Sequence, residues 1–434
     1  MLNLRGKTVA ILGAGRSGRA AAALAQTCGA EVCVFDAAAE ISGMPEGVKT
    51  HFGADVSTGE SFCSDIVVLS PGIETGSDFV QAFAKKSDAV WGEIELAYRC
   101  FQGKIIAITG TNGKTTTTEL VDTLVRACGL TCAPCGNYGT PFSEVVIMDE
   151  PPQVVALELS SFQLETIDEF RADARIWLNF SPDHMDRYHS VEEYRAAKLR
   201  IFENLGEFDL LIVRAGEDLG DLARHATTFS AEEDADWSFS EGEIFHGGEP
   251  FVTMAETRLH GRHNAENVMA ACAAVEAVAP LTLETAREAL RHYAPPKHRC
   301  ELIRTLDGVF YLNDSKATNL HAMESAIKSQ DQPIVLIAGG KEKGLDYRPA
   351  AELFAGRVRA ALVFGQIGPL LKDVFSPVVD CQQFETLPEA IKAARAQAEV
   401  GNVVLFSPGT SSFDQFTGYE QRGDVFREVV LALR

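Results

Sequence analysis

A phosphate-binding turn is the strongest chemical signal in this sequence. Residues 110–115 read Gly-Thr-Asn-Gly-Lys-Thr, follow the mostly β-branched run 104–109 and precede a helix-forming segment that begins at Thr116. Two glycines allow successive backbone N–H groups to converge on phosphate oxygens, and the helix adds the positive end of its dipole. The Lys114 ammonium would then reach the terminal phosphates of a nucleotide, and the Thr115 hydroxyl would bind Mg²⁺.

The turn departs from the general P-loop pattern at one position. That pattern requires a glycine where this sequence has Ile108, so only the shorter form from Gly110 to Thr115 is present. A strand-to-helix turn that binds no ligand is therefore the alternative interpretation.

Glu158, at the end of a second apolar run, is expected to lie beside the phosphate-binding turn. Glu158 ends the run 154–158 and begins the motif Glu-Leu-Ser-Ser-Phe-Gln-Leu at 158–164. A carboxylate at the end of a strand next to a phosphate loop is where Mg²⁺ coordination is expected, and burying it without a cation would be costly. A local cap or ion pair is the alternative role for Glu158.

Two later segments carry charged side chains of less certain role. The loop 179–189 contains two histidines and two aspartates, but a transition-metal site would need more ligands. The simpler role is that of one histidine near Mg²⁺-bound phosphates. In the helical segment 194–202, Lys198 shares a face with apolar side chains. The residues alone indicate a snorkelling lysine, whose charge argues against a role as a magnesium ligand.

A second glycine-rich turn lies near the start of the chain. Residues 13–18 read Gly-Ala-Gly-Arg-Ser-Gly between a strand and an Ala-rich helix, and Asp36 ends the next strand. This arrangement satisfies the dinucleotide fingerprint, including its distant acid. The mechanism requires only a diphosphate and a ribose-like partner, so NAD and a nucleotide sugar both fit. A packing turn without a ligand is the third possibility.

Apolar strands alternate with helical patterns in three successive stretches, which predicts an α/β fold with parallel sheets covered on both faces. We expect three domains. They are an N-terminal Rossmann-like nucleotide-binding domain at 1–93, a central P-loop ATPase-like domain with a parallel sheet at 94–296, and a C-terminal Rossmann-like domain at 297–434. The adjacent prolines Pro295 and Pro296 break the helix before the last boundary.

The charge composition of the chain argues against two classes of binding partner. The chain has 434 residues, with 39 Lys and Arg against 61 Asp and Glu, and a formal net charge of −22. This charge would repel nucleic acid and anionic membrane surfaces. The sequence has no apolar run of membrane-spanning length and no cleavable signal layout. We expect a cytoplasmic monomer that acts on small molecules.

Ten cysteines are scattered among apolar neighbours, as reduced core thiols usually are. Cys128, Cys132 and Cys135 have a spacing that could serve an iron–sulfur cluster or a redox dithiol. Core packing is the better interpretation, because the triplet spans a helix end and the start of a strand.

Taken together, these motifs resemble the Mur ligases over essentially the whole chain. Their order and combination are specific, and several look like the members that add D-glutamate. The motifs that carry the resemblance lie at 109–115, 158–164, 183–186, Lys198, 261–267, 298–299, 313–319 and 407–416.

The resemblance implies an ATP-dependent amide ligase of peptidoglycan precursor synthesis, and hence a role in cell-wall biogenesis, cell shape and cell division. ATP would phosphorylate the carboxylate of UDP-N-acetylmuramoyl-L-alanine, and the amine of D-glutamate would attack the acyl phosphate. A tetrahedral intermediate would collapse to the peptide bond. The implied cofactors are ATP and Mg²⁺ at two sites, with Lys198 carbamylated by CO₂. A carbamate is an anionic oxygen ligand, which removes the objection to Lys198.

The resemblance also implies that domain 1–93 binds the UDP-substrate, domain 94–296 binds ATP and domain 297–434 binds the amino acid. It implies roles for individual residues as well. The catalytic set is Lys114, Glu158, His184, Lys198 and Lys316. The ATP set is Gly110, Thr111, Asn112, Gly113, Lys114, Thr115, Thr116, Asn267, Arg299 and Asp314. The UDP-substrate set is Gly15, Arg16, Ser17, Asp36, Gly72, Asn137, Ser160 and Gln163. The D-glutamate set is Lys316, Thr318, Lys343, Ser412 and Phe413. The metal set is Thr115, Glu158, His184 and Lys198 as its carbamate.

Two departures and three rival functions stay open. Ala37 stands where some relatives place polar or basic contacts, and Lys341 stands where some place an acid, so the uracil and D-glutamate contacts are in doubt. A folylpolyglutamate synthase shares the ATP loop but should lack the first nucleotide module. An NAD-dependent dehydrogenase leaves the second phosphate loop unexplained. A nucleotide-switched binding protein would have no ligase activity.

Overall fold

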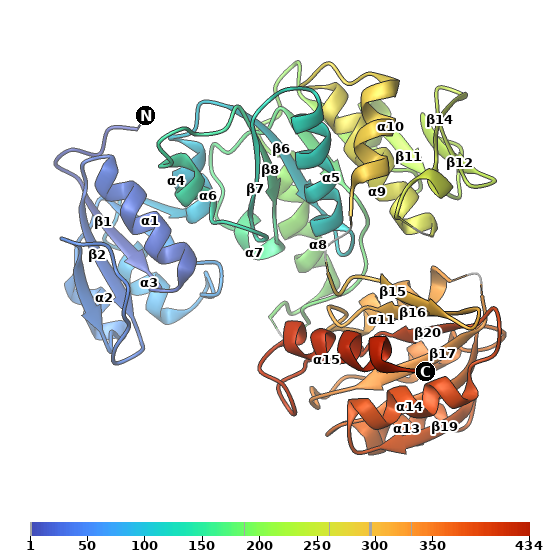
Figure 1. Ribbon diagram of the computed structural model, residues 1–434. Helices are drawn as coiled ribbons and strands as arrows, with labels where there is room; N and C mark the ends of the chain where they lie inside the picture. The colour runs from blue at the N-terminus through green and yellow to red at the C-terminus, as the bar shows by residue number, and fades with distance from the viewer. Residues whose placement is uncertain (1, 186, 260, 295–296, 331) are drawn as a thin grey trace. The chain divides into compact units, whose positions relative to one another are not determined.

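The computed structural model describes residues 2–185, 187–259, 261–294, 297–330 and 332–434. These residues form three β-sheets flanked by helices, which confirms an α/β fold dominated by parallel strands (Figure 1). They group into two compact units. The first comprises the described residues of 2–259 and 264–293, and the second comprises those of 261–263 and 294–434. Pro295 and Pro296 lie outside the described residues.

The N-terminal sheet has five parallel strands in the order β3-β2-β1-β4-β5. The strands are β1 (Thr8–Leu12), β2 (Glu31–Asp36), β3 (Lys49–Phe52), β4 (Ile66–Leu69) and β5 (Ala89–Gly92). The helices are α1 (Arg16–Thr27), α2 (Val56–Ser61), α3 (Asp78–Ala84) and α4 (Glu93–Tyr98). β1 pairs with β2 on one side and with β4 on the other, so the strand order reverses there. Ligands of open α/β sheets bind beyond the carboxyl ends of the strands at such a point.

The central sheet has nine strands in the order β14-β13-β12-β11-β10-β9-β6-β8-β7. The strands are β6 (Lys104–Thr109), β7 (Cys132–Gly136), β8 (Val154–Glu158), β9 (Ala174–Trp177), β10 (Leu210–Arg214), β11 (Thr227–Ser230), β12 (Trp237–Ser240), β13 (Glu243–His246) and β14 (Glu249–Thr253). The helices are α5 (Lys114–Ala127), α6 (Phe142–Val146), α7 (Ser161–Leu164), α8 (Val191–Leu199), α9 (Arg262–Glu276) and α10 (Leu283–His292), with 3₁₀ turns η1 (Arg200–Phe202), η2 (Gly220–His225) and η3 (Met254–Glu256).

One edge of the central sheet differs from the all-parallel prediction. β12, β13 and β14 pair antiparallel. Short turns join them, and Gly242, Gly247 and Gly248 have positive φ angles in these turns. Two-residue turns with positive φ join antiparallel neighbours, whereas parallel strands need a long crossover.

The C-terminal sheet has six strands in the order β15-β16-β20-β17-β18-β19. The strands are β15 (Glu301–Leu306), β16 (Val309–Asn313), β17 (Ile334–Gly339), β18 (Val358–Phe364), β19 (Asp380–Phe384) and β20 (Val403–Phe406). The helices are α11 (Leu320–Lys328), α12 (Arg348–Glu352), α13 (Gly368–Phe375), α14 (Leu387–Gln397) and α15 (Tyr419–Ala432). β15 is antiparallel to its neighbour β16, and their hairpin turns at Asp307 and Gly308, both with positive φ.

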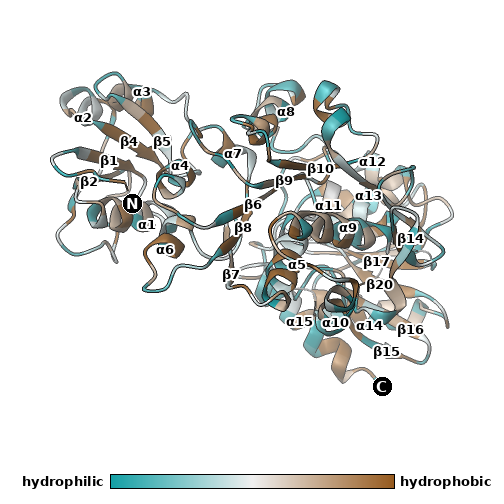
Figure 2. Ribbon diagram, turned by 90° about the horizontal axis from the view of Figure 1, so that it is seen from above, coloured by the Kyte–Doolittle hydropathy of each residue, from teal (hydrophilic) through white to brown (hydrophobic). Residues whose placement is uncertain are grey.

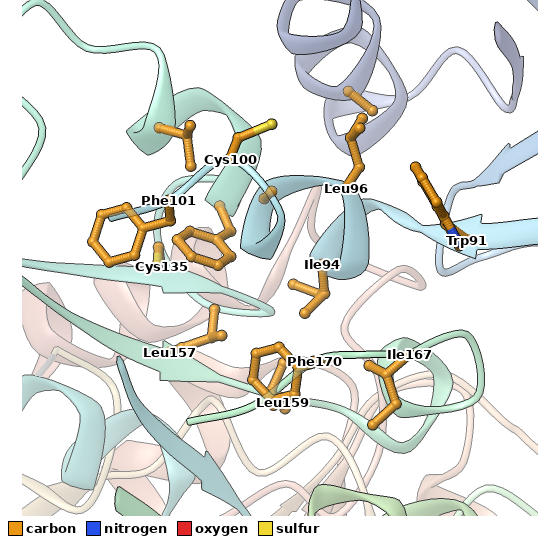
Figure 3. Close-up of a cluster of buried hydrophobic side chains, with 14 of the residues drawn as sticks. Trp91, Ile94, Leu96, Cys100, Phe101, Cys135, Leu157, Leu159, Ile167 and Phe170 are labelled. Atoms are coloured by element: carbon orange, nitrogen blue, oxygen red, sulfur yellow. The ribbon is translucent and has the colours of Figure 1, made fainter. Parts of the chain in front are cut away.

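The first two sheets share a continuous apolar core. Helix α4 contributes Ile94 and Leu96, and the neighbouring strands contribute Cys135 and Leu157 to the same buried cluster (Figure 3). The strands β6, β8 and β9 are mostly hydrophobic (Figure 2). This shared core explains why the first two sheets belong to one compact unit.

Cys132 and Cys135 are buried in these cores, and burial raises the pKa of both thiols. Their setting is the apolar packing expected for core cysteines. Among the helices of the described residues, none is long and apolar enough to cross a membrane.

Candidate functional site

The phosphate loop, residues 110–115, joins β6 to α5 as predicted. Gly110 and Gly113 have φ angles of +155° and +82°, which L side chains rarely adopt. A Cβ on Gly113 would lie 2.4 Å from the Asn267 side-chain oxygen. The Lys114 Nζ donates hydrogen bonds of 2.8 Å to the carbonyls of Gly110 and Thr111. The lysine therefore lies over the loop, and Thr116 lies in the first turn of α5.

Two asparagines from distant segments hold this loop. Asn179, just after β9, accepts a hydrogen bond from the Asn112 N–H through its side chain and donates to the Asn112 carbonyl. Asn267, in α9, is buried and accepts from the Thr117 hydroxyl at 3.2 Å. The structure thus brings the predicted ATP residue Asn267 beside the loop.

Glu158 ends β8 and is 2% exposed. Its Oε2 accepts a 2.8 Å hydrogen bond from the Thr115 hydroxyl, and its Oε1 accepts a 2.7 Å bond from the Asn137 amide. The pairing of β6 with β8 sets Glu158 opposite Ile108, one strand away from the loop. Glu158 is therefore hydrogen-bonded both to the second predicted metal ligand, Thr115, through a buried contact and to the predicted substrate residue Asn137, which is itself exposed.

Lys198 is 1% exposed, so the snorkelling interpretation is wrong. Ser190 caps α8 by accepting from the Glu193 N–H, and the helix directs Lys198 inward, where its Nζ donates a 2.8 Å hydrogen bond to the Gly110 carbonyl. Burial lowers the pKa of the ammonium well below its usual value, and the charge of Lys114 lowers it further. These effects favour the neutral amine.

His184 lies near the same helix but is more exposed. Its backbone φ is +56°, and its Nε2 lies 3.8 Å from an Asp183 carboxylate oxygen. The imidazole contacts Phe162 and Tyr194 edge-on, and the Lys198 Nζ lies 5.1 Å from the centre of the Tyr194 ring. Tyr194 is thus common to both predicted metal residues. Asp186, from the same motif, lies outside the described residues.

The turn 13–18 is tight, and its backbone is held by a hydrogen bond to the Asp36 side chain. Asp36 accepts hydrogen bonds from the Ala14 N–H at 2.7 Å and from the Ala38 N–H at 2.9 Å. A Cβ on Gly18 would lie 1.8 Å from the Gly13 carbonyl oxygen, so the tight turn needs glycine there. Asp36 therefore shapes the turn, and its predicted contact with uracil or ribose stays a prediction.

The other predicted UDP-substrate residues are spread along this unit. Gly15 and Arg16 are exposed, Ser17 is half-buried, and Arg16 donates to the Gly139 carbonyl. Gly72 follows β4, and the adjacent Pro71 carbonyl accepts a hydrogen bond from Arg187. This bond ties the loop after β4 to the loop that carries His184.

Ser160 and Gln163 form a capping box at the start of α7. The Ser160 hydroxyl accepts from the Gln163 N–H, and the Gln163 side chain accepts from the Ser160 N–H. Part of the hydrogen-bonding capacity of both side chains is therefore used inside the motif 158–164 itself.

In the second unit, Asp314 follows β16 and is buried. Its carboxylate accepts from the Ser407 hydroxyl at 2.8 Å and from the Cys300 N–H at 3.2 Å. Burial raises the pKa of Asp314 to about 7. Arg299, half-buried, belongs to the segment just before β15.

The predicted D-glutamate residues gather on loops at the carboxyl ends of β16, β17 and β20. The Lys316 Nζ lies 3.8 Å from the centre of the Tyr419 ring, and the Lys343 Nζ donates to the Thr318 carbonyl at 3.4 Å. Ser412 is buried. Phe413, the next residue, is 65% exposed.

The sequence matches two protein-family models. Residues 108–275 match the Mur ligase middle domain, and residues 298–409 match the Mur ligase, glutamate ligase domain. A UDP-N-acetylmuramoylalanine--D-glutamate ligase from Salinibacter ruber is 38% identical over 98% of this chain and 97% of its own. This chain belongs to the Mur ligase family. A protein of the same name from Geobacter metallireducens is also 38% identical to this Mur ligase, over 100% of this chain and 99% of its own.

Solved structures agree on the fold of this Mur ligase. A MurF ligase from Thermotoga maritima in complex with ADP matches with a TM-score of 0.63 and 16% identity over 99% of this chain and 97% of that one. A pseudomurein peptide ligase type C from Methanothermus fervidus matches with a TM-score of 0.58 and 15% identity, over 99% of this chain and 100% of that one.

Several side chains that support the Mur ligase site were not predicted from the sequence. Asn179, which holds the phosphate loop, stands in a segment singled out only for its histidines and aspartates. Tyr194 and Ser407 belong to segments that the sequence singles out, but no contact was predicted for either side chain. For Asn179 and Ser407, the position just after a strand was the available signal, since such residues face the carboxyl edge of a parallel sheet. For Tyr194, the available signal was its place on the same helix as Lys198.

Proposed function

We propose that this Mur ligase joins D-glutamate to UDP-N-acetylmuramoyl-L-alanine at the expense of ATP, in peptidoglycan precursor synthesis. The observation that carries the proposal is that proteins named for this reaction are 35–38% identical to the chain over nearly its full length. The buried contact of Glu158 with Thr115 beside the phosphate loop supports the use of ATP.

The proposed reaction has two steps. A carboxylate oxygen of the UDP-linked substrate attacks the γ-phosphorus of ATP, and ADP leaves. The amine of D-glutamate then attacks the acyl carbon, loses a proton, and the tetrahedral intermediate expels phosphate to leave the amide. Both steps join anions, so charge neutralisation and positioning supply most of the catalysis.

Lys114 and the N–H groups of residues 110–115 would bind the β- and γ-phosphates. Ligand binding would draw the Lys114 ammonium away from the carbonyls of Gly110 and Thr111, which now accept from it. Asn267 and Arg299 would grip ATP, and Asp314 would accept from its ribose hydroxyls.

The residues beside the loop fit Mg²⁺. Among the described residues, no group of three or more His, Cys, Asp or Glu side chains is arranged to hold a metal, but Mg²⁺ uses one or two carboxylates together with substrate phosphates and water. Glu158 and Thr115 offer two buried oxygens of the required kind. When bound, Mg²⁺ neutralises charge on the transferring phosphoryl group.

The setting of Lys198 fits carbamylation. CO₂ adds to a neutral amine, and burial favours that form of Lys198. The product is an oxygen ligand, which with His184 would serve a second Mg²⁺.

The remaining assignments concern the other two substrates. Gly15, Arg16, Ser17, Asp36, Gly72, Asn137, Ser160 and Gln163 would contact the UDP-linked substrate. Lys316, Thr318, Lys343, Ser412 and Phe413 would hold D-glutamate, whose carboxylates suit the two lysines. We further infer a cytoplasmic monomer of three domains, at 1–93, 94–296 and 297–434, the first two packed through the shared core at α4.

A phosphate-release assay tests the proposal. Release from ATP should require both UDP-N-acetylmuramoyl-L-alanine and D-glutamate. Dependence on a folate in place of the UDP-substrate would indicate a folylpolyglutamate synthase, and dependence on neither would indicate a nucleotide switch. Lys114→Ala should abolish ligation in a folded protein, and ligation by that variant would contradict the assignment. With ¹⁸O in the substrate carboxylate, one label should appear in the released phosphate.

A further inference from the structure

Arg422 is a fully buried cation in the second unit. It lies in the first turns of α15, and its side chain is 0% exposed. The guanidinium donates to the Ser315 carbonyl at 2.8 Å and the Ser315 hydroxyl at 3.1 Å. It also donates to the carbonyls of Thr410 at 3.1 Å and Gly339 at 3.4 Å.

These acceptors belong to three different loops. Ser315 follows β16, Gly339 ends β17 and Thr410 follows β20. All three loops leave the same edge of the sheet, because the three strands are mutually parallel. One planar side chain therefore joins three segments that are separated widely in the sequence.

Each loop also carries a residue proposed to hold the amino-acid substrate. Lys316 directly follows Ser315, Ser412 lies two residues after Thr410, and Lys343 lies four residues after Gly339. The guanidinium thus contacts the backbone near the start of each substrate-binding segment.

The loops close tightly on the guanidinium. Gly340 has a φ of +143°, and a Cβ there would lie 2.9 Å from the Arg422 Nη1 and 2.2 Å from the Ser411 carbonyl oxygen. The Ser315 hydroxyl donates in turn to the Tyr419 carbonyl at the start of α15. Small displacements of Arg422 would therefore move all three loops.

Packing alone does not account for a cation at this position. All the described hydrogen bonds of Arg422 go to neutral oxygens. Burial lowers the pKa of the guanidinium to about 10, although the charges of Asp414 and Asp314 act in the opposite direction without hydrogen-bonding to it. A buried charge without a hydrogen-bonded counter-ion costs free energy that an apolar side chain of similar volume would not. The five N–H donors in a fixed fork provide what an apolar side chain cannot, a set geometry for several acceptors.

We propose that Arg422 is a positioning residue for the incoming amino acid, because its guanidinium fixes the spacing of the loops that carry Lys316, Lys343 and Ser412. The inference rests on the proposed function and adds a residue that touches no substrate. Arg422 should therefore affect the binding of D-glutamate more than that of the UDP-linked substrate, whose proposed contacts lie in the first unit.

Steady-state kinetics of Arg422→Lys tests the proposal. Lysine keeps the charge but presents a point donor that cannot span three loops. We expect the KM for D-glutamate to rise about tenfold or more, and the KM for UDP-N-acetylmuramoyl-L-alanine to change less than about twofold. A merely structural role would reduce the active fraction and leave both KM values unchanged.

Arg304→Lys is the matched control. Arg304 also donates only to backbone carbonyls in its described hydrogen bonds, those of Val430, Leu431 and Leu433 at the other end of α15. Its replacement should disturb the helix without changing the KM for D-glutamate. An equal rise in both variants would overturn the proposal.

Two further measurements keep the test decisive if Arg422→Lys folds poorly. Ser315→Ala removes one acceptor and leaves the guanidinium in place, and it should raise the KM for D-glutamate about threefold. Guanidinium ion, added to Arg422→Ala well below unfolding concentrations, should lower the KM for D-glutamate again. An unchanged KM in Ser315→Ala, or no response to guanidinium in folded Arg422→Ala, overturns the proposal.

The activity of the parent protein shows whether a negative result refutes this inference or the proposed function. A parent without D-glutamate-dependent phosphate release refutes the proposed function. A parent with that activity, together with an unaffected Arg422→Lys, refutes only the role of Arg422.

Discussion

The Nζ atom of Lys198 lies 2.8 Å from the carbonyl oxygen of Gly110 and donates a hydrogen bond to it. This bond ties α8 to the first residue of the phosphate loop. The neutral form of the buried amine is favoured, because burial and the Lys114 charge both lower its pKa. A neutral amine at the rim of a phosphate site is the form that reacts with CO₂.

The first prediction concerns the loss of this amine. Lys198→Ala should lower kcat by about 10²- to 10³-fold, the cost of removing one electrostatic contact at a transferring group. A short carboxylate such as acetate should restore part of the rate by occupying the vacated volume as an oxygen ligand. Mass spectrometry of the parent under CO₂ should show one added CO₂ on Lys198. Failure of rescue, with Lys198 unmodified, would remove the carbamate from the proposal.

Much of the central site follows from local pattern. The run 104–109 is apolar and β-branched, the glycines of 110–115 permit the turn, and Glu158 ends an apolar run, so strand, loop and carboxylate were all predicted where they occur. Parallel pairing then places these strand ends at one edge of the sheet.

Other features depend on contacts that a local pattern does not contain. Asn267 meets Gly113 only because its helix, α9, lies far along the chain and reaches α5 through the hydrogen bond between Thr117 and Asn267. The inward direction of Lys198 depends on the start of α8 at its Ser190 cap, since one residue of shift would rotate the side chain by about 100°. The joining of the first two sheets depends on α4, which buries Ile94, Leu96 and Ala97 in the core that both sheets share.

The second prediction concerns the carboxylate of Glu158. Glu158→Gln keeps the volume and one acceptor for the Thr115 hydroxyl or the Asn137 amide, so the protein should fold. It removes the negative charge that would hold Mg²⁺, so kcat should fall by about 10²- to 10³-fold and the Mg²⁺ concentration for half-maximal activity should rise. Glu150→Gln, at an exposed position, is the control. Parent-like Mg²⁺ dependence in Glu158→Gln would contradict the proposed metal role.

The third prediction separates backbone strain from contact in the phosphate loop. Gly113 and Gly129 have the same φ of +82°, but a Cβ would meet Asn267 at Gly113 and nothing within 4 Å at Gly129. Gly129→Ala should therefore lose only about 1 kcal/mol of unfolding free energy, the cost of a left-handed alanine. Gly113→Ala should lose about 1–3 kcal/mol more and raise the Kd for ATP about tenfold. Urea unfolding and ATP titration measure both, and equal effects of the two changes would show that the Asn267 contact does not matter.

The last prediction is a pH dependence set by Asp314. Burial raises its pKa from 3.8 to about 7, so between these values the folded protein binds a proton that the unfolded chain releases. Stability of the parent should therefore fall as pH rises toward 7, and this contribution should become constant above it.

Asp314→Asn removes that titration. Relative to the parent, the unfolding free energy of the variant should rise with pH, by up to about 4 kcal/mol over the full range and by part of that between about pH 5.5 and 8. Asp346→Asn is the contrasting control, because a hydrogen bond from Arg348 lowers the pKa of the exposed Asp346 to about 2, below the measured window. The unfolding free energy of Asp346→Asn should change with pH in parallel with that of the parent. If the curve of Asp314→Asn were also parallel, Asp314 would be ionised throughout, and the buried contacts with Ser407 and Cys300 would be stabilising its charge.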